Sequence, residues 1–337
     1  MAIKVGINGF GRIGRVVLRI MMERPETFDI CGINLRKADV DYMVYMIKYD
    51  SVFRQFTGTV EREDQNLIVN GHRIRVFSEA DAAMIPWESC GAEYVIESTG
   101  AYNNTEKASR HFKGGAKKVI ITAPAKEEDI TIVMGVNHQE YDPAKHHIVS
   151  NASCTTNCLA PVAMVLQNEF GIQIGNMTTI HAYTNDQRIL DMAHKDPRRA
   201  RAAACNIIPT STGAAQAVAK VIPALKGKFS GYSLRVPTPT VSVVDFTGIL
   251  EKETDTETLL GKLKHASETY LKGILEYNDK PLVSMDFKGN PASSILEASY
   301  TTVQDGKMVK LVAWYDNEWG YSCRVCDLAC LMAEKGL

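Results

Sequence analysis

The sequence lacks an excess of either charge and lacks any long apolar segment. Its 337 residues contain 38 Lys and Arg against 39 Asp and Glu, for a formal charge of -1. This balance does not provide the basic surface of a dedicated nucleic-acid binder. No run of about 18 apolar residues is present, as a membrane helix would require, and no cationic segment precedes an apolar one at the N-terminus. We therefore expect a soluble, cytoplasmic protein with no dedicated nucleic-acid or membrane partner.

Cysteine is too sparse and too irregularly spaced for a disulfide scaffold, which favours a reducing compartment. Three of the eight cysteines, Cys323, Cys326 and Cys330, recur on one helical face, but no fourth ligand follows them. We expect packing there and no metal. The others are Cys31, Cys90, Cys154, Cys158 and Cys205. At roughly 150 residues per domain, the length suggests two domains.

Short apolar runs alternate with helical spacing over the first 150 residues. This alternation is typical of a parallel sheet with crossover helices, and it predicts an α/β, Rossmann-type doubly wound domain. Asn70-Gly71 favours a type I′ turn, so a β-hairpin is expected around it. We predict strands at 3–8, 28–34, 94–97, 118–122 and 130–136, helices at 16–26 and 105–112, and hairpin strands at 58–69 and 73–77.

The pattern changes after residue 150, where longer alternating runs follow a helix. Alternation of apolar and polar residues is typical of strands with one buried face. We therefore predict a second, α+β domain with a mixed or antiparallel sheet. Its expected strands are 176–183, 230–235, 240–250, 294–297 and 308–315, and the expected helices are 154–170, 256–271 and 322–334.

Gly9, Gly11 and Gly14 form a G-x-G-x-x-G motif between the first predicted strand and the first predicted helix. Glycines at this spacing let the backbone turn tightly and approach a pyrophosphate at the positive end of the helix. The alternative is a tight turn that binds nothing. The placement in a strand-turn-helix unit favours a dinucleotide.

The acidic residue that usually follows the second strand of such a fold is missing. The sequence there is Asn34-Leu35-Arg36-Lys37. A carboxylate at this place binds the ribose 2′-hydroxyl and repels a 2′-phosphate. Its absence, with two cations following, favours use of NADP as well as NAD. An ordinary surface loop with solvated charges is equally consistent with the sequence.

Cys154 stands at the predicted start of a helix, where backbone N–H groups and the helix dipole favour a thiolate. A thiol nucleophile also needs a base. His181 lies in an alternating strand, and we expect this strand to lie beside the helix that begins at Cys154. We expect the histidine to hold the thiolate as an ion pair and then to act as acid or base. A structural histidine is the alternative interpretation.

Basic and hydroxyl residues cluster downstream of His181, among them Thr184, Arg199, Thr212 and Arg235. Hydroxyls and a glycine at a helix start can cradle phosphate, and an arginine can bind it through two N–H groups. Some of these arginines belong instead to a solvated loop or a subunit interface. The full set is Thr184, Arg188, Arg198, Arg199, Arg201, Thr210 to Gly213, and Arg235.

Taken together, the motifs resemble phosphorylating glyceraldehyde-3-phosphate dehydrogenases over essentially the whole chain. The ordered segments are GINGFGRIGR at 6–15, SNASCTTNCLAP at 150–161, HAYTNDQ at 181–187, RRARAAA at 198–204, STGAA at 211–215, RVPTP at 235–239 and WYDNEWGYS at 314–322. The resemblance implies oxidation of D-glyceraldehyde 3-phosphate through a thiohemiacetal and thioester on Cys154, followed by phosphorolysis to 1,3-bisphosphoglycerate.

The resemblance also assigns binding roles to individual residues. It implies a dinucleotide-binding domain of residues 1–151 and 318–337, closed by the C-terminal helix, a catalytic and tetramerisation domain of residues 152–317, and a homotetramer. Ser153, Thr155, Thr212 and Gly213 would hold the attacking phosphate, and Thr184, Arg199 and Arg235 the substrate phosphate. Arg12 and Ile13 would contact the pyrophosphate, Thr122 the nicotinamide ribose and Asn317 the carboxamide.

The sequence departs from the family's NAD-specific pattern at three places. Leu35 stands where an Asp binds the ribose, Ala80 where an Arg lines the adenine end, and Met192-Ala193 where Leu-Pro presses on the ribose from a neighbouring subunit. These changes favour dual or NADP-preferring use, with Arg36 or Lys37 near the 2′-phosphate. The absence of an Arg at Ala80 weakens this hypothesis, because an Arg there can assist the binding of either cofactor.

Two other functions are compatible with parts of the pattern. An erythrose-4-phosphate dehydrogenase would share the thiol chemistry, but that sibling lacks the Ser-Thr-Gly segment present here at 211–213. A non-catalytic dinucleotide-binding or RNA-binding regulator would need neither Cys154 nor His181. Phosphate dependence of product formation separates the first alternative, and a Cys154→Ser variant separates the second.

Overall fold

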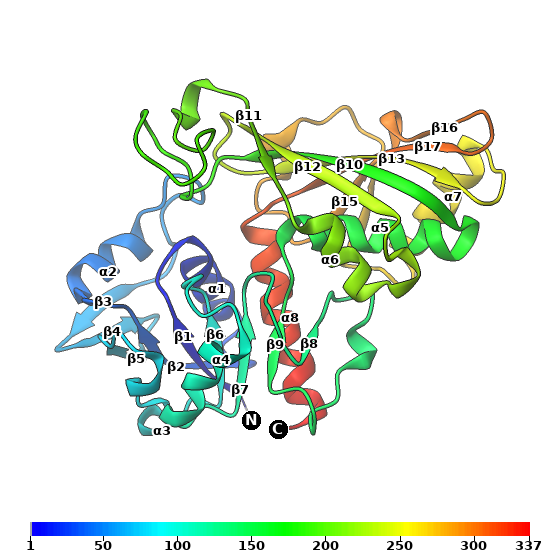
Figure 1. The fold of residues 1–337 in the computed structure, drawn as a ribbon. Helices are drawn as coiled ribbons and strands as arrows, with labels where there is room; N and C mark the ends of the chain where they lie inside the picture. The colour runs from blue at the N-terminus through cyan, green and yellow to red at the C-terminus, as the bar shows by residue number, and fades with distance from the viewer. Residues whose placement is uncertain (1) are drawn as a thin grey trace. The chain divides into compact units, whose positions relative to one another are not determined.

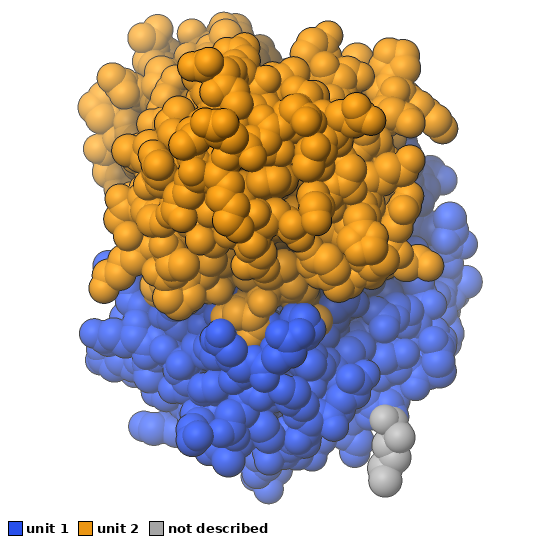
Figure 2. Space-filling model, turned by 90° about the vertical axis from the view of Figure 1, so that its right-hand side faces the viewer, with its two compact units in different colours: residues 1–132, 138–152, 322–337 blue, residues 133–137, 153–321 orange. Residues whose placement is uncertain are grey.

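The computed structural model describes residues 2–337, which fall into two units that each contain one sheet. Unit 1 consists of Met1–Ile132, His138–Ala152 and Ser322–Leu337, and unit 2 of Val133–Asn137 and Ser153–Tyr321 (Figure 2). The chain enters the main part of unit 2 one residue before Cys154 and returns to unit 1 within the last helix. Unit 1 is therefore discontinuous in sequence.

The sheet of unit 1 is the predicted doubly wound parallel sheet (Figure 1). Strands in the order β5, β2, β1, β6, β7, β9, β8 run parallel. The order reverses between β1 (Ile3–Asn8) and β6 (Tyr94–Glu97), which is where open α/β sheets bind ligands. The other strands are β2 (Phe28–Asn34), β5 (His72–Phe77), β7 (Lys118–Ile121), β8 (Ile130–Thr131) and β9 (Ile148–Ser150).

An antiparallel arm of β3 (Val60–Glu63) and β4 (Asn66–Val69) extends this sheet beyond β5. Asn70 and Gly71 have φ angles of +52° and +77°, so the predicted type I′ turn is confirmed. The single strand predicted at 58–69 is wrong. Asp64, with a φ of +52°, turns the chain and divides that segment into β3 and β4.

The helices of unit 1 are shorter or differently placed than predicted. The first, α1 (Arg12–Met22), begins and ends before the predicted 16–26, and Pro25 disfavours helical backbone in the residue before it. The helix predicted at 105–112 is α4 (Thr105–Ala108) followed by a 3-10 segment, Ser109–Gly114. The strand predicted at 130–136 ends at Thr131. The remaining helices are α2 (Val40–Lys48), α3 (Trp87–Cys90) and α8 (Trp319–Lys335), which enters unit 1 at Ser322.

The sheet of unit 2 is mixed, as predicted. Its order is β11, β12, β10, β13, β17, β15, β14, with β16 paired to β17. The pairs β10–β12 and β14–β15 are parallel and the others antiparallel. The bounds are β10 (Ile172–Ala182), β11 (Ile208–Ser211), β12 (Phe229–Val236), β13 (Ser242–Leu250), β14 (Leu275–Asn278), β15 (Ser294–Glu297), β16 (Thr302–Gln304) and β17 (Met308–Tyr315).

Three helices pack on this sheet, and the longest carries the candidate nucleophile at its first position. This helix, α5 (Cys154–Phe170), matches the predicted bounds and contacts β10, β13, β15 and β17. It also packs against α6 (Ala214–Val221), and both lie on the same side of the sheet (Figure 1). The third, α7 (Thr256–Glu268), ends three residues before its predicted end at 271.

No helix within residues 2–337 is long and apolar enough to cross a bilayer. The described part of the chain also contains no group of three or more His, Cys, Asp or Glu side chains arranged to hold a metal ion. Cys323, Cys326 and Cys330 all lie on α8 as free thiols, together with Cys31, Cys90, Cys154, Cys158 and Cys205 elsewhere.

Candidate functional site

The glycine turn of unit 1 needs Gly9 and Gly14 for its own geometry and leaves space at Gly11. Gly9 has a φ of +106°, a conformation that disfavours side chains. A Cβ on Gly14 would lie 2.3 Å from the carbonyl oxygen of Gly9, whereas a Cβ on Gly11 would meet nothing within 4 Å. Gly11 is also the N-cap of α1 and has no capping side chain. The turn therefore fits a phosphate group at the start of α1.

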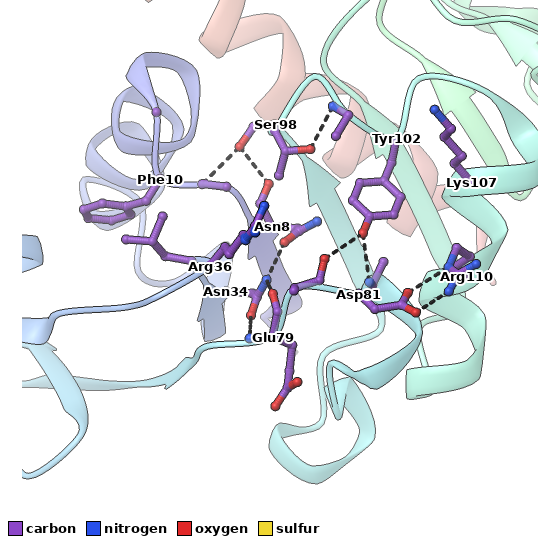
Figure 3. Close-up of a pocket in the computed structure, with 17 residues that line it drawn as sticks. Asn8, Phe10, Asn34, Arg36, Glu79, Asp81, Ser98, Tyr102, Lys107 and Arg110 are labelled. Carbon is purple, nitrogen blue, oxygen red and sulfur yellow. Dashed lines mark hydrogen bonds and ion pairs between the residues drawn. The ribbon is translucent and has the colours of Figure 1, made fainter.

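A cavity of about 680 Å³ opens at this turn, entirely within unit 1 (Figure 3). Two of its lining side chains, Asn8 and Asn34, form with Glu97 a chain of hydrogen bonds across the ends of three strands. Asn34 Nδ2 donates to Asn8 Oδ1 at 2.8 Å, and Asn8 Nδ2 donates to Glu97 Oε2 at 2.6 Å. Asn34 also binds the main chain of Glu79 through both its oxygen and its nitrogen. These bonds hold the wall that faces the cavity in a fixed shape.

Leu35 and Arg36, which stand where an acidic residue usually follows the second strand, line this cavity. Leu35, Arg36 and Ala80 are among its walls, as are Glu79 and Asp81. Asp81 is occupied by a bidentate pair with Arg110, whose hydrogen bond lowers the pKa of that carboxyl (Figure 3). The cavity wall therefore carries the apolar Leu35 next to Arg36, a cation that has no ion-pair partner among residues 2–337.

Other residues predicted to contact the cofactor are engaged locally. The Arg12 guanidinium pairs with Asp50 and lies 5.6 Å from the centre of the Phe53 ring, so any contact with a pyrophosphate uses the main chain of Arg12. Ile13 follows it in the first turn of α1. Thr122 Oγ1 donates to the carbonyl of Glu97 at 3.0 Å and does not line the cavity.

In unit 2, the candidate nucleophile and base are in contact. Cys154 Sγ lies 3.4 Å from His181 Nε2. The other ring nitrogen, Nδ1, lies 2.7 Å from the carbonyl oxygen of Ala182. Donation from Nδ1–H to this carbonyl gives the tautomer in which Nε2 is unprotonated and directed at the thiol, whereas an N–H donated to Nδ1 by Arg235 gives the opposite tautomer. The first tautomer is set to accept the thiol proton.

Strand register explains why Arg235 joins this pair. In the parallel pairing of β10 and β12, His181 lies directly opposite Arg235, so their side chains leave the sheet on the same face. The Arg235 guanidinium contacts His181 Nδ1 and donates to the carbonyl of Ala182 at 3.2 Å. That carbonyl oxygen thus accepts from both side chains. A permanent positive charge is therefore placed beside the thiol and the imidazole.

Burial disfavours the charged forms of both the thiol and the imidazole in this arrangement. Burial and then the Arg235 charge lower the pKa of His181 to about 3. Burial raises the pKa of the Cys154 thiol, although Arg235 and the Thr155 hydroxyl and N–H act in the opposite direction. The expected thiolate–imidazolium ion pair therefore has to offset the lost solvation of two charges in this pocket.

Tyr315 supports both sides of the site from a third strand, β17. Its hydroxyl lies 2.8 Å from Thr155 Oγ1 on α5 and 2.8 Å from Thr179 Oγ1 on β10. Its ring meets the His181 ring edge-on, with centroids 6.0 Å apart. The tyrosine is buried, and this burial raises the pKa of its hydroxyl. Tyr315 therefore fixes the helix start relative to the histidine.

The candidate phosphate residues are tied to neighbours in the same unit. Arg199 pairs with Asp186 and donates from Nε to Thr210 Oγ1 at 2.9 Å. Thr184 N–H donates to the Gln187 side chain at 3.2 Å. The local electrostatics show that Arg199 acts on Arg235, since its charge contributes to the lowered pKa of Arg235 after burial. The two arginines predicted for one phosphate therefore share one electrostatic environment.

Two hydroxyls predicted for the attacking phosphate already accept main-chain N–H groups at helix starts. Ser153 Oγ accepts from Thr156 N at 3.1 Å and thereby caps α5. Thr212 Oγ1 accepts from Ala214 N at 3.2 Å at the start of α6, and a Cβ on Gly213 would meet nothing within 4 Å. Thr155 is bonded to Tyr315 as described above. For Thr184, Thr212 and Gly213 the structure gives local contacts only, with no contact to Cys154.

Asn317 lies just after β17 and is held by Ser242 of β13. Ser242 Oγ donates to Asn317 Oδ1 at 3.0 Å and accepts from Ala182 N at 3.0 Å. The Asn317 side chain is buried in unit 2. Through Ser242 it is linked to the main-chain N–H of Ala182, the residue after His181. Asn317, the residue predicted to contact the nicotinamide, and His181, the predicted base, are therefore joined by one hydrogen-bond network.

Comparison with known proteins adds the family. Residues 3–105 match the description "Glyceraldehyde 3-phosphate dehydrogenase, NAD binding domain", and residues 153–317 match "Glyceraldehyde 3-phosphate dehydrogenase, C-terminal domain". The chain belongs to the glyceraldehyde-3-phosphate dehydrogenase family. It is 56% identical over 337 residues to glyceraldehyde-3-phosphate dehydrogenase of Geobacillus stearothermophilus and 55% identical over 337 residues to glyceraldehyde-3-phosphate dehydrogenase 1 of Bacillus subtilis, with 100% of each chain covered.

A more distant relative shows the same full-length match. The glyceraldehyde-3-phosphate dehydrogenase of Streptomyces coelicolor is 51% identical over 336 residues, which cover 99% of this chain and 100% of that one. The resemblance drawn from the motifs is therefore confirmed, as is the dehydrogenase class with an NAD-binding domain. Neither alternative function, the erythrose-4-phosphate enzyme or the idle regulator, gains support from these matches.

Within this dehydrogenase family site, two kinds of residue were not predicted. Tyr315 lies within the quoted segment 314–322, but the motif gave it no role, because its meeting with Thr179 depends on tertiary packing. Asp186 lies within the quoted segment 181–187 and likewise had no role assigned; in the structure it pairs with both Arg199 and His194. For His194 the only sequence signal is its proximity to the basic cluster.

Proposed function

We propose that the protein is a phosphorylating glyceraldehyde-3-phosphate dehydrogenase that converts D-glyceraldehyde 3-phosphate, inorganic phosphate and NAD or NADP reversibly to 1,3-bisphosphoglycerate. The observation that supports this best is the 3.4 Å contact between Cys154 Sγ and His181 Nε2 at the start of α5. Arg235 stands beside both groups in strand register. A nucleophile, a base and an anion-binding cation thus converge in one family-consistent site.

The first steps follow from the protonation states. His181 Nε2 accepts the thiol proton, and the Cys154 sulfur forms a bond to the aldehyde carbon while the carbonyl π electrons move to oxygen. His181 then returns the proton to this oxygen, which gives a thiohemiacetal. The Arg235 charge favours the thiolate as it forms, because it lowers the energy of negative charge on sulfur.

The later steps use the same two side chains. His181 takes the hydroxyl proton as the carbon–hydrogen bond is lost, and the carbon becomes the carbonyl of a thioester. A dinucleotide, when bound, supplies the acceptor for that hydride. An oxygen of inorganic phosphate then attacks the thioester carbon, and the carbon–sulfur bond breaks. The acyl phosphate is released, and Cys154 is left as a thiolate. The thiolate regains its proton from His181.

We assign two phosphate sites in unit 2. The attacking phosphate is held by Ser153, Thr155, Thr212 and Gly213, and the substrate phosphate by Thr184, Arg199 and Arg235. The packing of α5 against α6 supports the first set, because the residues come from the starts of these two helices. The electrostatic coupling of Arg199 and Arg235 supports the second.

The cofactor proposal rests on the shape of the cavity in unit 1. Gly9, Gly11 and Gly14, with the main chain of Arg12 and Ile13, receive the pyrophosphate. Asn34, Leu35 and Arg36 surround the adenosine ribose, while Thr122 and Asn317 act toward the nicotinamide end. Leu35 and the unpaired Arg36 in the cavity wall support the use of NADP as well as NAD. No metal takes part.

We also propose a cytoplasmic homotetramer in which residues 1–151 and 318–337 bind the dinucleotide and residues 152–317 carry catalysis and assembly. Apolar side chains that monomers rarely expose support an interface. Ile189 and Leu190 are each 76% exposed, and Met192 is 66% exposed. Light scattering after size-exclusion chromatography tests this state, and a monomeric mass would contradict it.

One steady-state experiment tests the activity. The protein is assayed with glyceraldehyde 3-phosphate, with and without inorganic phosphate, against NAD and NADP. We expect cofactor reduction that depends on phosphate, with acyl phosphate as the product. Turnover independent of phosphate would favour the erythrose-type enzyme, and no turnover would favour an idle regulator. A preference for NAD above about a hundredfold, roughly 2.7 kcal/mol, would exclude dual use.

A further inference from the structure

We propose that Asp186 is a built-in competitor for the substrate phosphate, which must displace it from Arg199, and that His194 receives Asp186 when it is displaced. This inference rests on the proposed function, in which Arg199 holds the substrate phosphate. It makes Asp186 a residue that sets phosphate affinity and His194 a positioning residue that acts through it.

The contacts of Arg199 show that its binding surface is already in use. Its Nη1 is bonded to Asp186 Oδ2, and its Nε donates to Thr210 Oγ1 at 2.9 Å and lies 3.5 Å from Asp196 Oδ2. A guanidinium binds carboxylate and phosphate through the same pair of N–H groups. A phosphate that binds Arg199 through Nη1 therefore competes with the Asp186 carboxylate. The Asp186 side chain is 48% exposed, so the pair can open toward solvent.

Asp186 also affects the second phosphate arginine. Burial lowers the pKa of Arg235, the Arg199 charge lowers it further, and the Asp186 charge raises it. A carboxylate that acts on both arginines offsets part of the positive charge that an anion would meet there. Its removal from Arg199 therefore strengthens the attraction of this region for phosphate.

His194 lies next to the second carboxylate oxygen of Asp186. Its Nε2 lies 3.6 Å from Asp186 Oδ1, the oxygen that Arg199 does not bind. His194 Nδ1 lies 2.9 Å from the main-chain nitrogen of Asp196 and 3.1 Å from its carbonyl oxygen. In the tautomer that accepts the Asp196 N–H, the ring proton stands on Nε2 toward Asp186. Only 9% of the imidazole is exposed. Asp186 thus has two partners, one for each oxygen.

Charged groups surround His194. The carboxylates of Asp186 and Asp196 act on it, and Arg188 approaches through the carbonyl of Ala193, to which its guanidinium donates at 3.0 Å. A hydrogen bond from His194 Nε2 to Asp186 competes with the ion pair between Asp186 and Arg199. His194 therefore favours the release of Arg199 for phosphate.

The first test compares two aspartates of the same segment. Asp186→Asn removes the competitor, and Asp191→Asn serves as the control, because Asp191 forms a more exposed ion pair with Arg201, at 2.8 Å, in the same segment. We expect the KM for glyceraldehyde 3-phosphate to fall roughly twofold to fivefold in Asp186→Asn, the range of a partly exposed arginine–carboxylate pair. The control should leave KM unchanged, and neither variant should alter kcat/KM for unphosphorylated glyceraldehyde.

A rise in KM in Asp186→Asn, or an equal change for both aldehydes, would overturn the proposal, since Asp186 would then support Arg199 instead of competing for it. Calorimetric binding of glycerol 3-phosphate separates this result from a failure of the proposed function, because it requires no turnover. Tighter binding in Asp186→Asn supports the competition even if the wild type oxidises no aldehyde. Equal binding in the two proteins refutes it.

The role of His194 is tested with sulfate, which binds without turnover. If His194 Nε2 holds the displaced Asp186, His194→Phe should raise the sulfate Kd by about threefold, the effect of a weak, partly exposed polar pair. The same substitution made in the Asp186→Asn protein should leave the Kd unchanged, because the carboxylate that His194 would hold is gone. An unchanged Kd in His194→Phe, or an equal rise in both proteins, would remove His194 from the proposal.

Discussion

The glycine turn of unit 1 and the thiol site of unit 2 are built in opposite ways. The turn depends on main chain and on the lack of side chains, since Gly9 and Gly14 are required by close approaches and Gly11 leaves open space. The thiol site depends on side chains that already contact one another, with Cys154 bound to His181 and His181 to Arg235. The glycine turn therefore offers a ligand open space beside the main chain, whereas the thiol site offers reactive side chains that are already in contact.

This difference teaches where each kind of defect should appear. Changes in the thiol site remove groups that move protons or form bonds, so they should act mainly on kcat. Changes in the turn alter the fit of a ligand, so they should act on its affinity or on folding. The five predictions below either sharpen this division or break it.

The largest effect is expected for Cys154→Ser. Loss of the thiol removes the nucleophile, and a serine hydroxyl beside a neutral imidazole is far less reactive, so kcat should fall by roughly 10³-fold or more while NAD binding is unchanged. Cys158→Ser is the control, because Cys158 lies one turn further along α5 and is fully buried against Ser294. Cofactor reduction by Cys154→Ser with glyceraldehyde 3-phosphate would refute the covalent mechanism.

His181→Asn should lower kcat by roughly 10²-fold to 10⁴-fold, the usual range for loss of a general base. The KM for NAD should stay within about twofold of the wild type, because His181 belongs to the chemical site of unit 2 and not to the cavity of unit 1. Steady-state kinetics with varied NAD measures both. A large change in the KM for NAD would break the division between the two regions.

His181 should also make the protein sensitive to acid. Its folded pKa of about 3 lies below the ordinary value of about 6.5. As pH falls between these values the unfolded chain takes up a proton that the folded chain refuses, so stability decreases by about 1.4 kcal/mol per pH unit. Denaturation at pH 6 and pH 4.5 should show this loss in the wild type and in the His72→Asn control, but a smaller loss in His181→Asn. Equal losses in all three would contradict it.

Two glycines allow a matched test of the turn. Gly14→Ala places a Cβ 2.3 Å from the Gly9 carbonyl, so we expect it to destabilise the protein by about 1–3 kcal/mol and lower its Tm. Gly11→Ala meets no protein atom within 4 Å, so the Tm should stay unchanged. The added methyl group enters the space assigned to the pyrophosphate, and the Kd for NAD should rise by about tenfold. An unchanged Kd in Gly11→Ala would remove the pyrophosphate from this position.

How much the sequence could predict follows the same division. The glycine turn and the start of α5 were predictable because their signals lie within a few neighbouring residues. The pairing of His181 with Arg235 was not, because the two are 54 residues apart and meet only through the register of β10 and β12. Tyr315 reaches Thr155 across 160 residues, and no local pattern specifies such a contact.

The boundaries of short elements were missed for a related reason. Asp64 ends a strand that alternation alone would continue, and the 3-10 segment after Ala108 follows a helix that its composition would prolong. The occupancy of Arg199 by Asp186 was also beyond the sequence. An acidic residue beside a basic cluster is common, and only the geometry shows which arginine it binds.

The smallest effect is expected at Leu35, which lines the cofactor cavity of unit 1. Leu35→Asp restores a carboxylate at the ribose, which accepts the 2′-hydroxyl proton of NAD and repels the 2′-phosphate of NADP. The ratio of kcat/KM for NAD to that for NADP should rise by about tenfold, roughly 1.4 kcal/mol. Leu35→Asn is the control, because it has the same shape without the charge and should shift the ratio less. If both variants shift the ratio equally, the shape of the side chain at this position determines the cofactor preference. If only Leu35→Asp shifts the ratio, the missing negative charge determines it.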